Sequence, residues 1–198
     1  MNDLFFIAVA DSTGHGVPGA MISIVCNNAL NRAIKEFNLT DTGLILDKTR
    51  ELVIATFEKS RNKVKDGMDI SLLCIDYLNK KITWSGANNP LWYVCNNELK
   101  VIKANKQPIG NAEILKPFIC HEIEYLDNTT FYLFTDGFAD QFGGEKGKKF
   151  MYKQFSELLL LNNEATLNQQ AVIINDVFEK WKINHEQVDD VCVMGIKI

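Results

Sequence analysis

The hydrophobic pattern at the start of the chain predicts a strand followed by a helix. The nearly continuous apolar run Leu4–Ala10 stops at Asp11, which is typical of a central strand buried on both faces. Over Pro18–Phe37, apolar residues that include Met21 and Ile24 recur at helical spacing, and a proline is acceptable in the first turn of a helix. We therefore expect a buried strand that leads into a helix.

Three further helices are expected. Asp41 or Thr42 can cap the N-terminus of the first of them, and the apolar positions within Ile45–Phe57 recur at helical spacing. The same kind of pattern predicts helices over Tyr152–Leu161 and Thr166–Lys182. The helices thus come in two pairs, one near each end of the chain.

The middle of the chain changes to a strand pattern. Between Asp69 and about Tyr125, short apolar pieces are separated by turn residues, including Asn79–Lys80 and Asn96–Asn97, which indicates antiparallel strands and hairpins. Phe131–Phe134 and Val191–Ile198 are two further expected strands. This order of elements predicts a protein of the α+β or layered type.

Composition narrows the classes of function. The 21 basic and 25 acidic side chains are spread along the sequence and leave a net charge of -4, so nucleic acid is a poor candidate for a partner. No apolar stretch approaches the ~20 residues of a membrane span. We expect a cytoplasmic protein, and tethering through a sensor or membrane domain outside these residues stays open. The odd number of cysteines and the lack of C-x-x-C spacing favour reduced thiols at Cys26, Cys74, Cys95, Cys120 and Cys192.

Three aspartates stand at the ends of expected strands. Asp11 ends the first apolar run, Asp136 follows Phe131–Phe134, and Asp189 opens the last strand. Carboxylates that meet at one edge of a sheet system repel one another unless a divalent cation neutralises them. An oxygen-only set suits Mg2+ or Mn2+ better than Zn2+. Taken singly, each aspartate is more readily a turn former or a helix cap; jointly, with their flanking glycines, they predict a hydrolytic site with two ions.

Six segments carry a family resemblance: ADSTGHGVPGAM (10–21), DGMDISLLCID (66–76), SGANNPLWYV (85–94), QPIG (107–110), FTDGFADQFGG (134–144) and DDVCVMGI (189–196). In this order they resemble the blocks of the bacterial stage II sporulation E (SpoIIE)-type serine/threonine phosphatases. These form a branch of the metal-dependent, protein phosphatase 2C-like family. The resemblance covers nearly the whole chain, and its strength lies in the order of the blocks, since no single block is decisive.

The resemblance implies a metal site, position by position. Asp11 matches the aspartate that bridges both metal ions, and the backbone carbonyl of Ser12 matches the next ligand of the second ion. Asp136 and Asp189 match the remaining ligands of the first ion, and Asp190 is then a neighbour. Two ions, Mn2+ or Mg2+, are expected in the intact domain.

The resemblance also implies a fold and a function. The fold is a four-layer α/β/β/α sandwich, with two antiparallel sheets packed face to face and helices outside. The implied activity is hydrolysis of phosphoserine or phosphothreonine on a regulatory phosphoprotein, such as an anti-sigma antagonist with a STAS-type domain, in bacterial signal transduction. Whether the protein forms a homodimer is left open. The alternative is a non-catalytic interaction or signal-relay module with the same fold and an incomplete metal site.

The chain departs from the family pattern in two ways. The family carries a further aspartate in a G-G-D-type block, on a strand upstream of the one that ends at Asp11, and residues 1–198 do not contain it. We therefore expect a single phosphatase domain that lacks its N-terminal strand or strands, was cut from a longer sensor-fused protein and is weakly active as a fragment. The second departure is Asn88–Asn89, where many members have a His-Asn pair.

Other polar residues are secondary candidates. His15 can donate to a phosphate or carry a proton, but its glycine neighbours favour a role in the turn. Asp66 and Asp69 can hold a third, weaker ion, although a solvated turn is the more frequent arrangement, and Asp140 can support Asp136 from the next helical turn. A Ser/His/Asp triad is disfavoured, because the chain has no G-x-S-x-G elbow and Ser85 lies in a hairpin region.

Overall fold

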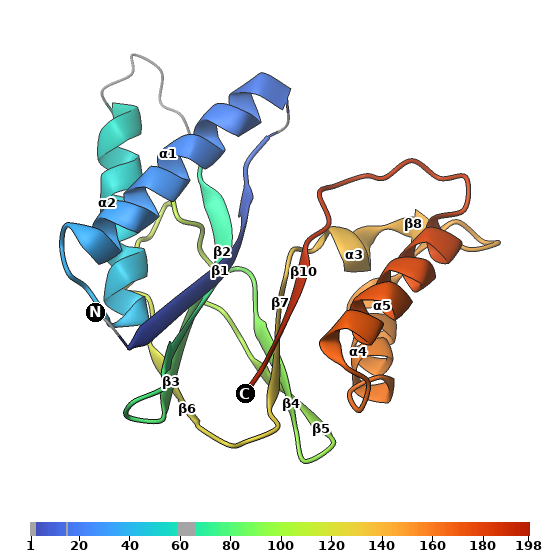
Figure 1. The fold of residues 1–198 in the computed structure, drawn as a ribbon. Helices are drawn as coiled ribbons and strands as arrows, with labels where there is room; N and C mark the ends of the chain where they lie inside the picture. Colours follow the sequence, from blue (N-terminus) through green and yellow to red (C-terminus); the bar gives the residue numbers. More distant parts are fainter. Residues whose placement is uncertain (1–2, 15, 59–65) are drawn as a thin grey trace. The chain divides into compact units, whose positions relative to one another are not determined.

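The chain forms two compact units in a computed structural model that describes residues 3–14, 16–58 and 66–198. The first unit comprises the residues up to Leu91 together with Lys103–Tyr125, and the second comprises Trp92–Ile102 together with Leu126–Ile198. Each unit has a four-stranded antiparallel sheet and a pair of long helices (Figure 1). The predicted α+β class is confirmed.

The sheet of the first unit has the strand order β1-β2-β3-β6. Its strands are β1 (Leu4–Ser12), β2 (Met68–Asp76), β3 (Lys81–Ala87) and β6 (His121–Glu124). β1 is therefore an edge strand of the described sheet, and Phe5 is 46% exposed, so the prediction of a central strand buried on both faces was wrong. An apolar run reports hydrophobicity, but it does not report how many neighbours a strand has.

Helices α1 (Gly16–Lys35) and α2 (Thr42–Glu58) lie side by side in the first unit (Figure 1). Asp41 caps α2, because its carboxylate accepts a hydrogen bond from the backbone N–H of Leu44. The predicted apolar face of α2 is confirmed, but Met21 and Ile24 of α1 are exposed. The face of α1 that packs into the core consists of Ile22, Cys26, Ala29 and Ala33.

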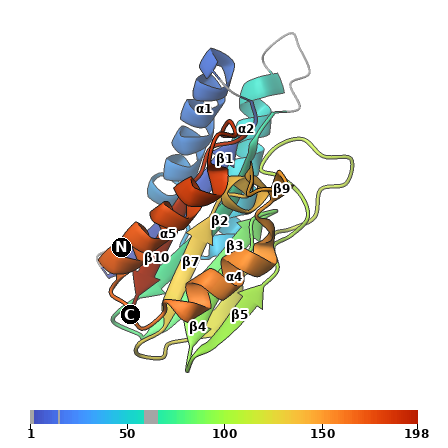
Figure 2. The ribbon, with the colours of Figure 1, turned by 90° about the vertical axis from the view of Figure 1, so that its right-hand side faces the viewer.

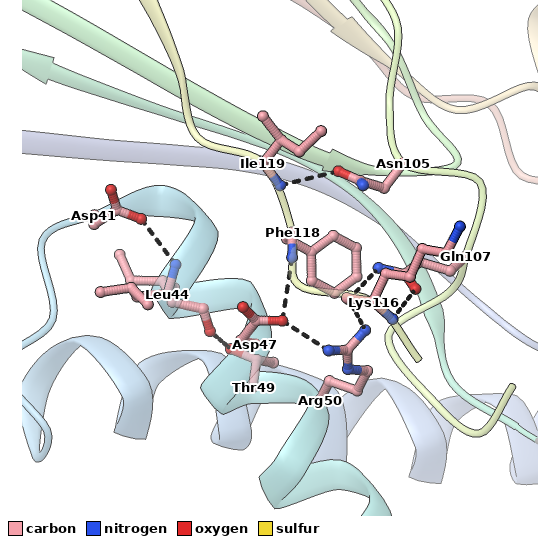
Figure 3. A network of polar contacts seen from close by, with 11 residues as sticks. Asp41, Leu44, Asp47, Thr49, Arg50, Asn105, Gln107, Lys116, Phe118 and Ile119 are labelled. Carbon is pink, nitrogen blue, oxygen red and sulfur yellow. Dashed lines mark hydrogen bonds and ion pairs between the residues drawn. The ribbon is translucent and has the colours of Figure 1, made fainter. Parts of the chain in front are cut away.

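A polar network in the first unit ties α2 to the segment that precedes β6 (Figure 3). Arg50 donates to Asp47 over 2.7 Å and to the carbonyl of Lys116 over 2.9 Å, and its guanidinium lies over the ring of Phe118. The Asp47 carboxylate also accepts the backbone N–H of Phe118. Gln107 pairs with both the N–H and the carbonyl of Lys116. These bonds order a long segment that forms no helix or long strand.

The sheet of the second unit has the order β10-β7-β4-β5. Its strands are β4 (Leu91–Cys95), β5 (Glu98–Ile102), β7 (Thr130–Phe134) and β10 (Val193–Lys197). β7 is completely buried, whereas β10 is half-buried at the edge of the described sheet. The hairpin turn predicted at Asn96–Asn97 joins β4 to β5, with positive φ at both residues.

Two amphipathic helices lie over this sheet, α4 (Met151–Leu161) and α5 (Leu167–Lys182) (Figure 2). Both predicted ranges are confirmed within a residue. Thr166 caps α5 in a capping box with Gln169. The core between helices and sheet is largely aromatic: Phe138 stacks on Phe155 at 4.4 Å. None of the described helices is long and apolar enough to cross a membrane, and all five cysteines are free thiols.

Three short elements of the second unit had no counterpart in the sequence prediction. They are helix α3 (Gly137–Asp140) and the two-residue strands β8 (Phe142–Gly143) and β9 (Lys148–Lys149), which pair as a small hairpin. One turn of helix and two residues of strand are too short to show a hydrophobic period. The hydrophobic pattern therefore predicted no element at this place.

Candidate metal centre

Asp136 begins helix α3, two residues after β7 ends. It has helical backbone angles, φ -72 and ψ -17, and its side chain makes no capping hydrogen bond. The turn is closed through the main chain, because the N–H of Asp140 donates to the carbonyl of Asp136 over 2.9 Å. The Asp136 carboxylate is therefore not used to cap helix α3.

Asp189 lies in the connection between α5 and β10, and the last strand begins at Val193, two residues later than the predicted start at Val191. The connection runs beside the Asp136 turn. Thr135 Oγ1 donates to the carbonyl of Asp190 over 2.9 Å and accepts the N–H of Cys192 over 3.0 Å. This double use of one hydroxyl holds the segment that carries Asp189.

Gly137 makes this close approach possible. A Cβ atom at this position would lie 2.5 Å from the carbonyl oxygen of Asp190, a distance that real Cβ atoms do not tolerate. Glycine is thus needed at position 137 because a side chain would clash with the segment at Asp190, and not because of an unusual φ.

The two carboxylates of the second unit form an electrostatically unfavourable pair. A carboxylate oxygen of Asp136 lies within 4.8 Å of one of Asp189. Burial raises the pKa of Asp136 above its usual value, and the charges of Asp189 and Asp140 raise it further, while the charge of Lys149 partly opposes them. A divalent cation between the two carboxylates would relieve both the desolvation and the repulsion.

Three more polar side chains surround Asp136. Lys149 Nζ pairs with the Asp140 carboxylate over 2.9 Å, and both charges act on Asp136. Burial, and then the charges of Asp136 and Asp140, raises the pKa of the Tyr152 hydroxyl to about 12, so this group stays protonated and can donate a hydrogen bond. The sequence analysis did not predict Lys149 or Tyr152 as site residues, because neither belongs to a recognisable motif.

Asp11 and Ser12 lie in the first unit, at the end of β1. In the antiparallel register Asp11 stands opposite Asp69 of β2, so both carboxylates project from the same face of the sheet. Asn88 donates a side-chain N–H to Asp69 over 2.8 Å. Asp69 therefore lies in a strand and not in the solvated turn that was the more frequent expectation. Like charges placed opposite each other are destabilising, so this pair also favours a cation.

The turn that follows β1 is built from small residues. Gly14 and Gly16 have φ of +89 and +66, as expected for backbone that favours glycine. Ser12 Oγ lies 2.7 Å from Ser23 Oγ of α1, which ties the end of β1 to the helix. Asp66 is half-buried in the coil before β2. His15 lies outside the described residues.

Ser85 is not available as a nucleophile. It is fully buried in β3, and its hydroxyl makes hydrogen bonds to Thr42 Oγ1 over 2.8 Å and to the carbonyl of Ile119 over 2.9 Å. A serine that is enclosed in this way cannot reach a substrate. This placement agrees with the disfavoured status of a Ser/His/Asp triad.

A family model described as "Stage II sporulation protein E (SpoIIE)" matches residues 2–198. The chain belongs to the SpoIIE family. A search of curated proteins found no match. Among solved structures, this SpoIIE-family chain is similar to the SiaA-PP2C domain of Pseudomonas aeruginosa, with 27% identity and a TM-score of 0.90 over 100% of this chain and 77% of that one.

Two more distant structures share the fold of this SpoIIE-family chain. One contains the PP2C phosphatase domain of the cell fate determinant SpoIIE from Bacillus subtilis, at 13% identity and a TM-score of 0.76, over 98% of this chain and 55% of that one. The other is the serine/threonine phosphatase PstP/Ppp of Mycobacterium tuberculosis, at 14% identity and a TM-score of 0.60, over 98% and 88%. The predicted family and the protein phosphatase 2C-like fold are confirmed.

The donor set fits a hard divalent cation. Asp136 and Asp189 in the second unit, and Asp11, Asp69 and the Ser12 carbonyl in the first, offer only oxygen atoms, and the charge of Asp189 makes the ionised form of Asp136 unfavourable unless a positive charge lies between them. Mg2+ and Mn2+ prefer such ligands, whereas Zn2+ prefers sets that contain nitrogen or sulfur. The chemistry of these residues thus matches what the family suggests.

Proposed function

We propose that this chain is a metal-dependent phosphatase that hydrolyses phosphoserine or phosphothreonine on a regulatory protein. The observation that carries the proposal is the Asp136–Asp189 pair, two carboxylates held within 4.8 Å in a chain of the SpoIIE family. Such a pair is costly in the metal-free protein and is therefore more readily understood as a cation site than as a structural feature.

The proposed ligand roles follow the family pattern. By that pattern, Asp136 and Asp189 would hold the first ion, Asp11 would be a ligand of both ions, and the Ser12 carbonyl would be a ligand of the second. When bound, Mn2+ or Mg2+ supplies Lewis-acid polarisation of the phosphoryl group and activation of water, so that hydrolysis needs no covalent enzyme intermediate. The proposed cofactors are accordingly two divalent ions.

Lys149 and Tyr152 are the groups of the second unit that suit an incoming phosphoryl group. The ammonium of Lys149 is positive charge beside the carboxylates, and it is 41% exposed, so it is accessible to solvent. The Tyr152 hydroxyl remains a donor at neutral pH because its pKa is raised. We propose that these two side chains help to orient the phosphate oxygens.

The substrate that we propose is a phosphoprotein of a bacterial signalling system. A STAS-type anti-sigma antagonist is the partner that the family suggests. A second copy of this chain, in a homodimer, is the other proposed partner. The alternative is a non-catalytic relay module with the same fold, in which the carboxylates bind a partner or a single ion without turnover.

A phosphate-release assay separates the two functions. The protein should release phosphate from a phosphoserine peptide in the presence of Mn2+, and Asp136→Asn should lower kcat at least 100-fold. Asp176→Asn is the matched control, since Asp176 is exposed on α5, and it should keep full activity. A wild-type protein that binds Mn2+ but releases no phosphate would instead favour the non-catalytic module.

A further inference from the structure

Gln141 is a fully buried amide directly after helix α3. Its side-chain nitrogen donates to the carbonyls of Glu186 and Phe142, each over 2.9 Å, and its side-chain oxygen accepts the N–H of Val188 in a longer contact of 3.4 Å. Both ends of the amide therefore have partners, as burial of a polar group requires.

Two of these partners belong to the segment that carries Asp189. Residues 183–192 join α5 to β10 as turns and coil, so their main-chain groups depend on partners outside a helix or sheet. Val188 immediately precedes Asp189, and Glu186 lies three residues before it. One side chain thus holds the main chain at two points just ahead of the proposed metal ligand.

The main chain of Gln141 is itself fixed from two directions. Its carbonyl accepts the N–H of Phe150 over 3.0 Å and the indole N–H of Trp181 over 3.1 Å. Phe150 leads into α4 and Trp181 lies in the last turn of α5. The main chain that carries the amide is therefore held at a fixed place. A residue that positions a metal ligand needs such support.

The position of Gln141 relative to Asp136 is fixed as well. The two residues flank the single turn of α3, with Asp136 before it and Gln141 after it. The segment with Asp189 is consequently fastened on both sides: Glu186 and Val188 bind Gln141, while residues 190 and 192 bind Thr135. Asp189 lies between these two attachments.

We infer that Gln141 is a positioning residue, which sets the separation of the Asp136 and Asp189 carboxylates and through it the affinity for a divalent ion. The inference rests on the proposed role of these carboxylates as metal ligands. Groups that orient metal ligands without touching the metal commonly change affinity 10- to 100-fold when removed.

Mn2+ binding to the metal-free protein tests this role without requiring activity. Gln141→Met keeps the length of the side chain and removes its hydrogen bonds, and the Mn2+ dissociation constant, followed by electron paramagnetic resonance of free Mn2+, should rise about tenfold. Gln141→Asn keeps the amide but shortens it by one methylene, so it should weaken binding in the same direction. If circular dichroism shows that Gln141→Met does not fold, Gln141→Asn provides the test instead.

Gln170→Met is the matched control. Gln170 is another buried amide of the same unit, 2% exposed, and it bonds to Tyr132 and the carbonyl of Ala165, away from the Asp189 segment. The control should lower the melting temperature but leave Mn2+ affinity within about twofold. Equal Mn2+ affinity of wild type and both folded Gln141 variants would overturn the inference alone, whereas a wild-type protein that binds no Mn2+ would overturn the proposed metal site as well.

Discussion

The hydroxyl of Thr135 joins two segments more than fifty residues apart, since it donates to the carbonyl of Asp190 over 2.9 Å. The same oxygen accepts the N–H of Cys192, and the Thr135 N–H donates to the Cys192 carbonyl, so the contact continues the pairing of β7 with β10 toward Asp189. Thr135 is 3% exposed, and water cannot replace it easily. The predictions for Thr135, Asp136 and Gly137 concern this contact between β7 and the Asp189 segment.

Thr135→Val should destabilise the protein and weaken metal binding. The substitution keeps the shape of the side chain but leaves the Cys192 N–H and the Asp190 carbonyl without their partner, which costs about 1–3 kcal/mol. Urea unfolding of the metal-free protein measures this loss. Thr130→Val is the matched control, because Thr130 is also buried in the second unit and its hydroxyl has no hydrogen-bond partner among the described residues. The control should be neutral or stabilising, and equal losses in both variants would contradict the assigned role.

Gly137→Ala should be strongly unfavourable because of space. The new methyl group would meet the Asp190 carbonyl at 2.5 Å, so the Asp189 segment would have to move, at a cost of about 1–3 kcal/mol. Gly195→Ala is a suitable comparison, since its nearest neighbour is the mobile tip of Leu167 at 3.0 Å. Thermal melting should show a clearly larger decrease for Gly137→Ala, together with weaker Mn2+ binding. A Gly137→Ala protein that is as stable as wild type would mean that the segment is not held as described.

Asp136→Asn should stabilise the metal-free protein while removing its function. Burial and neighbouring carboxylates raise the pKa of Asp136, so the folded protein binds this proton more tightly than the unfolded chain does. The corresponding stability is present below the ordinary pKa and is lost as pH rises through the raised value. At neutral pH, with EDTA, the uncharged amide should therefore raise stability by about 1 kcal/mol, or roughly 2–4 °C.

The response to metal should differ between wild type and Asp136→Asn. Added Mn2+ stabilises the form that binds it, so the melting temperature of wild type should rise and that of Asp136→Asn should change little. Melting in EDTA at acidic pH should bring the two proteins closer together, because Asp136 is then protonated in both the folded and the unfolded state. A variant that melts below wild type in EDTA at neutral pH would argue against the repulsive pair.

Asp47 and Arg50 should show strong coupling in the first unit (Figure 3). Their side chains are 26% and 10% exposed and lie 2.7 Å apart, and Asp47 also accepts the N–H of Phe118. Removing one partner leaves the other charge without its counter-ion, although Arg50 keeps the Lys116 carbonyl and Asp47 keeps the Phe118 N–H, so Asp47→Ala and Arg50→Ala should each cost about 1–3 kcal/mol. The double variant should cost less than the sum by about 0.5–3 kcal/mol. Additive losses in urea unfolding would show that the pair contributes little.

Local patterns were sufficient to predict most of the elements. Asp41 or Thr42 was expected to cap a helix because it precedes an apolar helical period, and Asp41 makes the capping hydrogen bond. The helix expected from Thr166 follows from the same kind of period, and Thr166 is its N-cap. The hairpin turn at Asn96–Asn97 follows from residues that accept positive φ, whereas at Asn79–Lys80 it is Lys80 that has positive φ. Both kinds of signal depend on neighbours along the chain, which is why the sequence contains them.

The sequence by itself determined where the long helices and most strands lie, and which carboxylates stand near their ends, because these properties repeat or stop within a few residues. Only the tertiary structure decided that β1 is an edge strand of its described sheet, that Asp69 stands opposite Asp11, and that Gln141 binds the main chain beside Asp189. The physical reason is that these relationships depend on hydrogen bonds and packing between segments that are distant along the chain. No local hydrophobic period encodes such partners.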